Sequence, residues 1–312
     1  MRFPDQILNL YHYKLRTALD LAYRKEFGYL LGVFMEKTTG QNVYLDYLRR
    51  RGHDLTVDRE ILGHKMTLDL SDPGLSRYLI SRGVNEPNAT PAFAEALEKA
   101  VADRDSDEVA VLDVGANIGY FALLEAEIVG EDGIVYAFEP APSNRELLER
   151  NVRKNGYENR IEIRSWAIGD SDGSAQLVLS DHSNWHRVAV DPEDEEEERI
   201  AVDRRRVDSS LSEEGIEPES VIGVRMDVEG YEAAIFEGMG GIFDADSPAV
   251  IFVELHPSEL SDEELDQILS HLAEGGFTVE FAGQDRKTFE LNDPREVKSI
   301  GGSHVRLVLR RC

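Results

Sequence analysis

The chain has 312 residues and a formal net charge of −27, because 34 Lys and Arg face 61 Asp and Glu. A hydrophobic share of 41% excludes a wholly disordered protein, and the length allows one large or two modest domains. The acidic excess leaves no basic surface that could neutralise phosphates, which argues against nucleic acid as the main partner.

The charge is uneven along the chain. Residues 1–60 hold ten Lys and Arg against eight Asp and Glu, a net charge of +2, so the remainder of the chain carries −29. Dense surface acid is typical of proteins kept soluble in concentrated salt, where ions screen the self-repulsion. We interpret the chain as a halophilic protein of the haloarchaeal type, with a merely acidic protein as the alternative.

Apolar residues recur at three- and four-residue steps near the N-terminus, which predicts a helix over residues 4–35. Either this helix packs on the domain, or its Tyr and Phe side chains rest on a membrane surface or a partner. We take residues 1–55 as an N-terminal helical extension.

The cysteine count and the apolar runs bear on location. Cys312 is the only cysteine, which excludes an internal disulfide and a cysteine-based metal cluster. The longest apolar run, Tyr29 to Met35, is too short to span a bilayer, and no signal peptide is visible. We expect a cytoplasmic protein, with peripheral membrane contact through residues 4–35 as an option.

Residues 56–107 are expected to form an apron or lid before the main domain. Alternating residues over 60–70 predict a hairpin. Helical patterns follow at 75–82 and at 92–101, and Thr90 is the expected N-cap of the second.

From residue 108 to the C-terminus, strand and helix patterns alternate. The expected strands are 109–114, 134–138, 161–166, 221–226 and 249–254, and the expected helices are 120–129, 143–155, 231–239 and 261–274. This alternation predicts an α/β fold with a doubly wound, Rossmann-like parallel sheet.

Two stretches depart from that rhythm. Residues 176–179, 187–190 and 199–202 are expected to form short antiparallel strands, with a solvated acidic loop at 191–198. The last strand pattern, at 305–309, is expected to close the edge of the sheet.

The first strand ends in a glycine turn, Gly115-Ala116-Asn117-Ile118-Gly119, which opens a helix whose N-terminal N–H groups can face a ligand. Some 20 residues later, the second strand ends in Glu139, where a Rossmann-like unit places an acid on a ribose. A dinucleotide site would show G-x-G-x-x-G, whereas this spacing is G-x-N-x-G. Asp113 would also repel a pyrophosphate, but it suits a ligand with an ammonium group, such as S-adenosylmethionine.

Five segments, in order, resemble motifs of the FkbM family of S-adenosylmethionine-dependent methyltransferases. They are Val111–Ala122, Phe138–Asn144, Ala167–Asp170, Arg225–Glu232 and Val253–His256. The likeness covers about residues 60–280 and implies a class I methyltransferase fold over residues 108–312.

Carried over residue by residue, the resemblance implies a donor site over the glycine turn. Three residues are expected to line the donor: Gly115, Asn117 and Gly119. Asp113 is expected near its amino-acid end and Glu139 near its ribose. Asp170 is expected near the adenine, although a turn-forming Asp is the alternative.

Acidic side chains and a histidine follow the fourth and fifth strands, at the sheet edge where ligands bind in such folds. Methyl transfer to an alcohol needs a base, and Asp227 is the first candidate, His256 the second, with Glu229 beside them. A divalent cation is left open; if one binds, Asp227, Glu254 and His256 are its expected ligands.

We therefore predict an S-adenosylmethionine-dependent O-methyltransferase. Asp227-Val228-Glu229-Gly230 is not the (Asp/Asn)-Pro-Pro-aromatic motif of nucleic-acid N-methylases. The resemblance favours a hydroxyl of a sugar or glycan, lipid-linked or free, as the acceptor. An NAD-dependent oxidoreductase and a non-catalytic binding protein on the same fold are the alternatives.

Overall fold

The computed structural model describes residues 32–36, 42–52, 55–104, 109–189, 198–244, 247–284 and 287–311. The chain divides into two units. The first holds Met1–Asn85 together with Asp181–Asn184, and the second holds the remainder. The predicted divisions after residues 55 and 107 stay a prediction.

The first unit is small. It contains α3 (Val43–Arg50), the hairpin of β1 (Thr56–Ile61) and β2 (His64–Asp69), and α4 (Leu75–Arg82). The two strands pair antiparallel, which confirms the hairpin, and α4 packs on β2. Residues 181–184 join this unit because the Asp72 carboxylate accepts hydrogen bonds from the backbone N–H and the hydroxyl of Ser183.

Most of the predicted N-terminal helix, residues 4–31, lies outside the described residues, and so does any membrane contact through it. Among the helices that are described, none has the length and apolarity needed to cross a bilayer.

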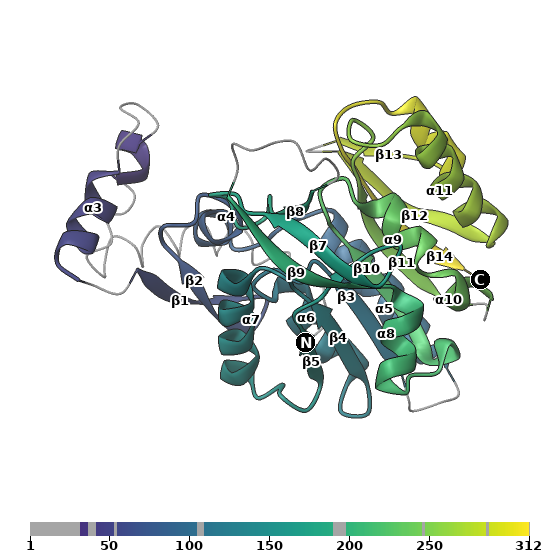
Figure 1. The fold of residues 1–312 in the computed structure, drawn as a ribbon, viewed down its shortest axis with the longest axis horizontal. Coiled ribbons are helices and arrows are strands. Elements are labelled where there is room, and N and C mark those ends of the chain that lie inside the picture. The colour runs from purple at the N-terminus through teal and green to yellow at the C-terminus, as the bar shows by residue number, and fades with distance from the viewer. Residues whose placement is uncertain are drawn as a thin grey trace. The chain divides into compact units, whose positions relative to one another are not determined.

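The second unit is built on an eight-stranded sheet (Figure 1). Its strand order is β13-β12-β14-β11-β10-β3-β4-β5. The bounds are β3 Ala110–Val114, β4 Ile134–Phe138, β5 Ile161–Arg164, β10 Val221–Met226, β11 Val250–Leu255, β12 Phe277–Gln284, β13 Lys287–Phe289 and β14 Val305–Arg311. The five strands β5, β4, β3, β10 and β11 are parallel, so their carboxyl ends meet at one edge.

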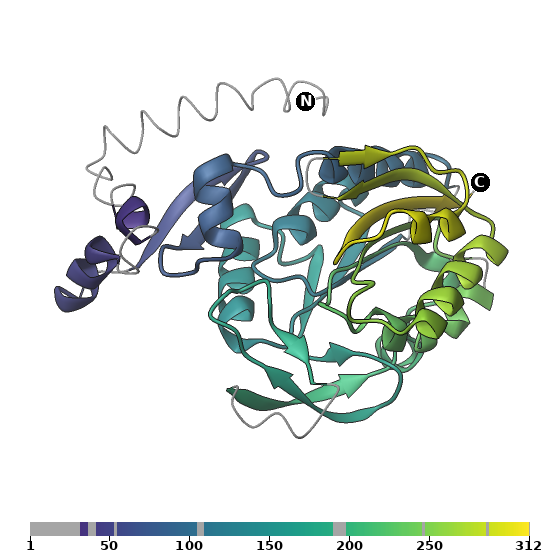
Figure 2. The same cartoon turned by 90° about the horizontal axis from the view of Figure 1, so that it is seen from above.

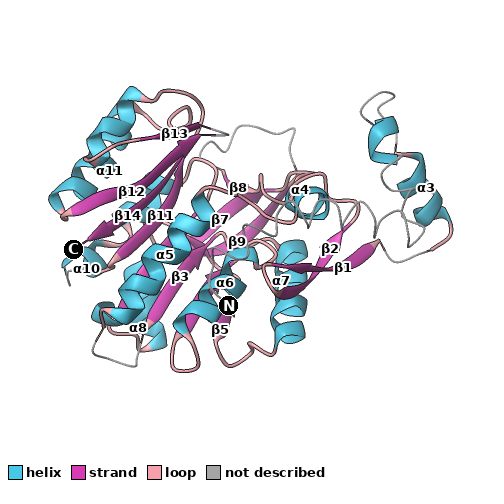
Figure 3. Ribbon diagram, turned by 180° about the vertical axis from the view of Figure 1, so that it is seen from behind, coloured by secondary structure: helices cyan, strands magenta, loops and turns pink. Residues whose placement is uncertain are grey.

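The central strands are continuous apolar runs because both faces of the sheet are covered. Every residue of β3, β10 and β11 is buried. Helices α5 (Ala89–Ala102), α6 (Tyr120–Val129) and α7 (Pro142–Asn155) cover one face (Figure 3). The other face is covered by α8 (Val207–Glu214), α9 (Glu232–Glu237), α10 (Gly240–Asp244) and α11 (Asp262–Glu274). This confirms the doubly wound, class I methyltransferase architecture.

Two details of the prediction are corrected. The strand at 305–309 does not close the edge: β14 lies inside the sheet, antiparallel to both β11 and β12. Thr90 is not a cap, because α5 begins at Ala89 and Thr90 is buried within its first turn.

A second, four-stranded sheet interrupts the alternation between β5 and β10, as predicted. Its order is β6-β9-β7-β8, from β6 (Ala167–Ile168), β7 (Gly173–Val178), β8 (Arg187–Val188) and β9 (Arg199–Arg205). Figure 2 shows it as a layer apart from the large sheet. The strands β7, β8 and β9 pair antiparallel. Of the acidic loop at 191–198, all but residue 198 lies outside the described residues.

Candidate active site

The turn between β3 and α6, residues 115–119, is held by its own backbone; we call it the donor turn. Gly115 and Gly119 have φ of 78° and 90°, and Asn117 has φ of 52°. A Cβ at Gly115 would overlap the backbone carbonyl oxygen of Asp227, at the end of β10. Only glycine allows the two strand ends to approach this closely.

The Glu139 carboxylate follows β4 and joins the donor turn. One oxygen accepts from the Asn117 N–H and the other from the Ala141 N–H, each at 2.8 Å. Burial raises the pKa of Glu139 to about 7, although those two hydrogen bonds act in the opposite direction. The structure thus brings Asn117 and Glu139 together, as a shared donor site requires.

Asp113 lies behind the turn, fully buried. The strand register sets Arg225 of β10 directly opposite it, and the two side chains form an ion pair of 3.1 Å. Burial raises the pKa of Asp113, while the Arg225 charge acts to lower it. The carboxylate therefore contacts the interior cation, and its expected place beside the amino-acid end of the donor stays a prediction.

Arg225 joins the donor turn to the residues after β10, and the sequence reasoning missed it. Its Nη1 donates to the Gly115 carbonyl at 2.8 Å, and its Nη2 pairs with Asp227 at 3.0 Å. The guanidinium also lies over the Phe121 ring. A charged residue inside the apolar run Val221–Met226 was the signal that could have revealed it.

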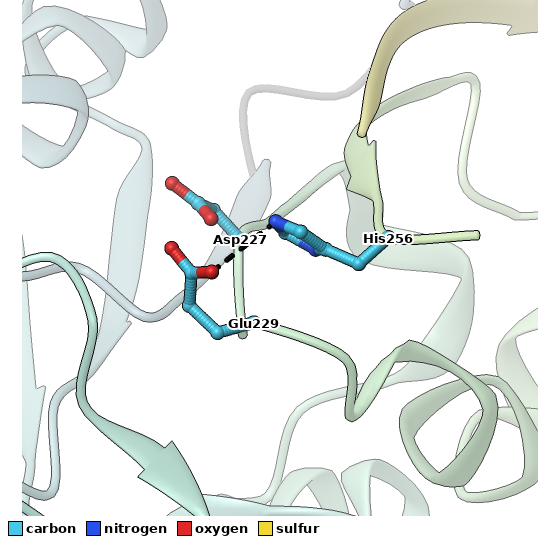
Figure 4. A group of neighbouring side chains, drawn as sticks. All are labelled: Asp227, Glu229 and His256. Atoms are coloured by element: carbon cyan, nitrogen blue, oxygen red, sulfur yellow. Dashed lines mark ion pairs between the residues drawn. The ribbon is translucent and has the colours of Figure 1, made fainter. Parts of the chain in front are cut away.

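The carboxyl ends of β10 and β11 carry the predicted catalytic residues. Asp227, Glu229 and His256 point toward one another, and one potential ligand atom from each lies within 4.8 Å of the others (Figure 4). His256 Nε2 is 3.3 Å from a Glu229 oxygen. Three side chains predicted from two separate motifs can therefore act on one reacting atom.

A fully buried carboxylate, Glu232 of α9, fixes the imidazole through a contact that was not predicted. Its Oε1 lies 2.6 Å from His256 Nδ1. Burial pulls the pKa of His256 down, but the Glu232 hydrogen bond and the charges of Glu232, Asp227 and Glu229 outweigh it and raise the pKa to about 9. A histidine with this pKa is cationic at neutral pH and has no lone pair for a proton.

Glu254 belongs to a second group, with Glu86 and Asp227. Arg306 of β14 stands opposite Glu254 in the register and pairs with it at 2.7 Å, and with Glu86 at 3.4 Å. Burial raises the pKa of both carboxyl groups. The trio predicted for a cation is thus divided: Glu254 falls in one group, His256 falls in the other, and Asp227 belongs to both.

Together these residues form what we call the acidic cluster: Glu86, Asp227, Glu229, Glu232, Glu254 and His256. Glu229 has φ of 52° and Glu86 has φ of 46°, a backbone region that non-glycine residues seldom adopt. Such conformations gather at functional sites.

Asp170 follows β6 in the small sheet and pairs with Arg204 at 3.3 Å. The Ser171 hydroxyl also donates to it. Its place near the adenine stays a prediction.

A family model described as the methyltransferase FkbM domain matches residues 113–279, more than half of the chain. The chain belongs to the FkbM methyltransferase family. This confirms the resemblance drawn from the five motifs. The family assignment supports S-adenosylmethionine as the cofactor and disfavours the nicotinamide alternative.

Curated relatives of this FkbM methyltransferase match over a shorter stretch. The protein-L-isoaspartate O-methyltransferase of Aeropyrum pernix is 39% identical over 80 residues, 26% of this chain and 28% of the relative. Protein-L-isoaspartate O-methyltransferase 1 of Archaeoglobus fulgidus is 34% identical over 87 residues, 28% of this chain and 36% of the relative. The chain therefore spans only about a third of the length of these relatives.

Solved structures give a looser likeness. The tRNA m1G37 methyltransferase of M. jannaschii has a TM-score of 0.41 at 15% identity, covering 82% of this chain and 57% of that one. An rRNA methylase from Streptococcus thermophilus has a TM-score of 0.41 at 13% identity, covering 73% and 99%. Likeness at this level says nothing about the acceptor of this FkbM methyltransferase.

The donor turn fits S-adenosylmethionine on physical grounds. A Cβ at Gly115 would meet the Asp227 carbonyl oxygen, so this glycine keeps the donor turn close to the end of β10. Glu139 keeps further lone pairs for ribose hydroxyls beside its two backbone hydrogen bonds.

Proposed function

We propose that this methyltransferase transfers a methyl group to a hydroxyl of a sugar or glycan. The observation that carries the proposal is the acidic cluster at the carboxyl ends of β10 and β11, beside the donor turn. A neutral polyhydroxyl acceptor is compatible with such a surface, because each carboxylate can accept a hydrogen bond from a hydroxyl.

The charge balance argues against an anionic acceptor. Five carboxyl groups gather there, and the cations recorded against them are Arg225, Arg306 and a protonated His256. An isoaspartyl carboxylate or an RNA phosphate would add negative charge beside carboxyl groups that already raise one another's pKa. This supports a neutral acceptor and no nucleic acid.

Asp227 is the preferred proton acceptor. S-adenosylmethionine, when bound, supplies the methyl group, and the acceptor hydroxyl must lose its proton as it attacks. Arg225 holds one Asp227 oxygen, whereas Oδ1 has no hydrogen-bond partner within the described chain. His256, cationic at neutral pH, is better suited to orient Glu229 than to act as a base.

Glu229 is the second candidate. Burial, with the Asp227 charge next in importance, raises its pKa to about 7. A base titrating near the working pH is efficient, so the two carboxylates have to be separated by experiment. If Glu229 is the base, the inflection of kcat near pH 7 disappears in Glu229→Gln and persists in Asp227→Asn at lower amplitude.

The proposed setting is a cytoplasmic, salt-adapted enzyme, with residues 4–35 as a contact to a membrane that carries a lipid-linked acceptor. Vesicle binding by the full chain, lost on deletion of residues 1–35, would support the contact. Equal binding by both chains, or none by either, would contradict it.

The function is tested in two steps, both in concentrated KCl. Calorimetry should show binding of S-adenosylhomocysteine and none of NAD. Transfer of labelled methyl is then compared for a neutral glycan fraction, an isoaspartyl peptide and tRNA. Label in the glycan alone supports the proposal, and label in the peptide or the tRNA overturns the acceptor class. The methylated atom follows from mass spectrometry of glycans from a deletion strain.

A further inference from the structure

We propose that Asp227, Glu229 and His256 form a binding site for one divalent transition-metal ion. The three side chains come from the turns after β10 and β11, and each offers one ligand atom within 4.8 Å of the other two (Figure 4). Two carboxylates and one imidazole form a ligand set that such ions accept.

The orientation of His256 is the first argument. Metal-binding histidines usually donate the second ring N–H to a carboxylate, which fixes the ring and leaves the other nitrogen for the ion. His256 Nδ1 lies 2.6 Å from Oε1 of Glu232, whose side chain is fully buried. Nε2 therefore faces Glu229, at 3.3 Å, on the side where Asp227 also lies, and an ion bound there would displace the proton that Nε2 carries in the metal-free protein.

The second argument is independent of the imidazole and concerns Asp227. Its Oδ2 is paired with Arg225, which fixes the carboxylate. Its Oδ1 is shielded from solvent and has no hydrogen-bond partner among the described residues. A shielded anionic oxygen without a partner is costly, and a metal ion is a group that would satisfy it.

A competing group exists, since Asp227 also lies with Glu86 and Glu254. Arg306 already occupies that side, at 2.7 Å from Glu254 and 3.4 Å from Glu86. A guanidinium supplies the positive charge there and would repel a dication, so the site with the imidazole is the better one.

The ligand set also indicates which ion binds. Mg²⁺ and Ca²⁺ prefer oxygen ligands, whereas an imidazole together with carboxylates favours Mn²⁺ or Zn²⁺. The proposal does not depend on the acceptor. An ion held here would occupy Asp227 Oδ1 and would itself make an acceptor hydroxyl more acidic, in place of the proton transfer that the metal-free site assigns to Asp227.

The test uses Mn²⁺ and the full chain, in concentrated KCl so that ions held loosely by the acidic surface are screened away. Electron paramagnetic resonance should show one bound ion per chain. Its electron spin echo should carry modulation from a directly bound imidazole nitrogen. His256→Gln should abolish the nitrogen modulation and weaken Mn²⁺ binding at least tenfold. His271→Gln, a change at an exposed histidine on α11, should alter neither.

Each other outcome counts against the proposal. Bound Mn²⁺ without nitrogen modulation would assign the ion to the carboxylates around Glu86 and Glu254 and overturn the site. No saturable binding would overturn it as well. Retained S-adenosylhomocysteine binding by His256→Gln shows that the variant is folded. If that variant does not fold, Glu229→Gln should weaken Mn²⁺ binding while keeping the nitrogen modulation, and unchanged affinity would contradict the proposal.

Discussion

The donor turn and the acidic cluster lie at the same edge of the sheet but are built by different means. In the donor turn, backbone N–H groups satisfy the one carboxylate present, Glu139, and positive φ values set the path of the chain. In the acidic cluster, carboxyl groups from three separate stretches of the chain face one another and raise one another's pKa. Local sequence sets the conformation of the donor turn, whereas the arrangement of the acidic cluster depends on strand register and on bound ligands. Arg225 contacts both.

The largest effect is expected from Arg225→Met, which removes the contact between the two regions. Asp113 would remain buried without its cation, a loss that typically costs about 3–5 kcal/mol of stability. Denaturant unfolding should show this decrease, and donor binding should fail in parallel. The control is Arg164→Met: Arg164 pairs with Glu214 in a half-buried position, so its loss should cost about 1 kcal/mol or less. Equal losses for both variants would contradict the role of Arg225.

Asp227→Asn should affect the acidic cluster alone. The amide keeps the shape but cannot take a proton, so kcat should fall by about 10²–10⁴-fold. Calorimetry should show S-adenosylhomocysteine binding nearly unchanged, because the donor turn keeps its own hydrogen bonds. Asp266→Asn, at a surface ion pair on α11, serves as the control and should leave kcat unchanged. Full activity in Asp227→Asn would remove Asp227 as the base.

Gly115→Ala, by contrast, should affect the donor turn. The new Cβ would overlap the Asp227 carbonyl oxygen, and φ of 78° adds strain of about 1–2 kcal/mol. Affinity for S-adenosylhomocysteine should drop at least tenfold. Gly156→Ala separates the two causes, because Gly156 has φ of 69° but open space around its Cβ position. If Gly156→Ala weakened donor binding equally, steric contact would not be the reason.

The last effect concerns pH. Burial raises the pKa of Glu139 from its ordinary 4.5 to about 7. Because the folded state holds this proton more tightly, the contribution of Glu139 to stability is complete below pH 4.5 and is lost as pH rises through about 7. The loss amounts to about 3 kcal/mol at most. Thermal unfolding of Glu139→Gln should show a flatter pH dependence between pH 4.5 and 7.

The pH dependence that Glu139 gives to donor affinity should be opposite to the one that it gives to stability. The ionised carboxylate accepts ribose hydroxyls, so affinity for S-adenosylhomocysteine should increase as pH rises through 7 and lose that dependence in Glu139→Gln. The control is Glu125→Gln, at a fully buried carboxyl of α6 whose pKa is also raised by burial. Its donor affinity should keep the wild-type pH profile.

Sequence reasoning was most accurate where local signals suffice. The helix at 120–129 and the strands at 134–138 and 221–226 were predicted with the observed bounds, because apolar runs end at glycines or at polar residues. The strand at 277–284 was missed, although Phe277, Val279 and Phe281 alternate with polar residues. Placing β14 inside the sheet needs knowledge of this missing neighbour.

The motifs of the site could be predicted from the sequence, but the contacts between its side chains could not. The acids after β10 and the histidine after β11 follow from the rule that ligands bind at the carboxyl ends of strands. Arg225 and Glu232 act through contacts that sequence spacing does not encode: a register between β3 and β10, and a helix that turns its first carboxylate inward. Glu86 precedes α5, more than a hundred residues before Asp227, and only the folded chain brings them together.

The three contacts of Arg225 have a thermodynamic consequence. One guanidinium holds the Gly115 carbonyl, Asp113 and Asp227 together, so a ligand that shifts the donor turn also changes the position and field of Asp227. Linkage requires such coupling to be reciprocal: if bound donor raises the affinity of the acidic cluster for its ligand by some factor, that ligand raises donor affinity by the same factor. The total free energy of binding the donor and the second ligand should therefore be the same in either order. Arg225→Lys cannot make all three contacts, so it should reduce the coupling factor more than it reduces the affinity for either ligand alone.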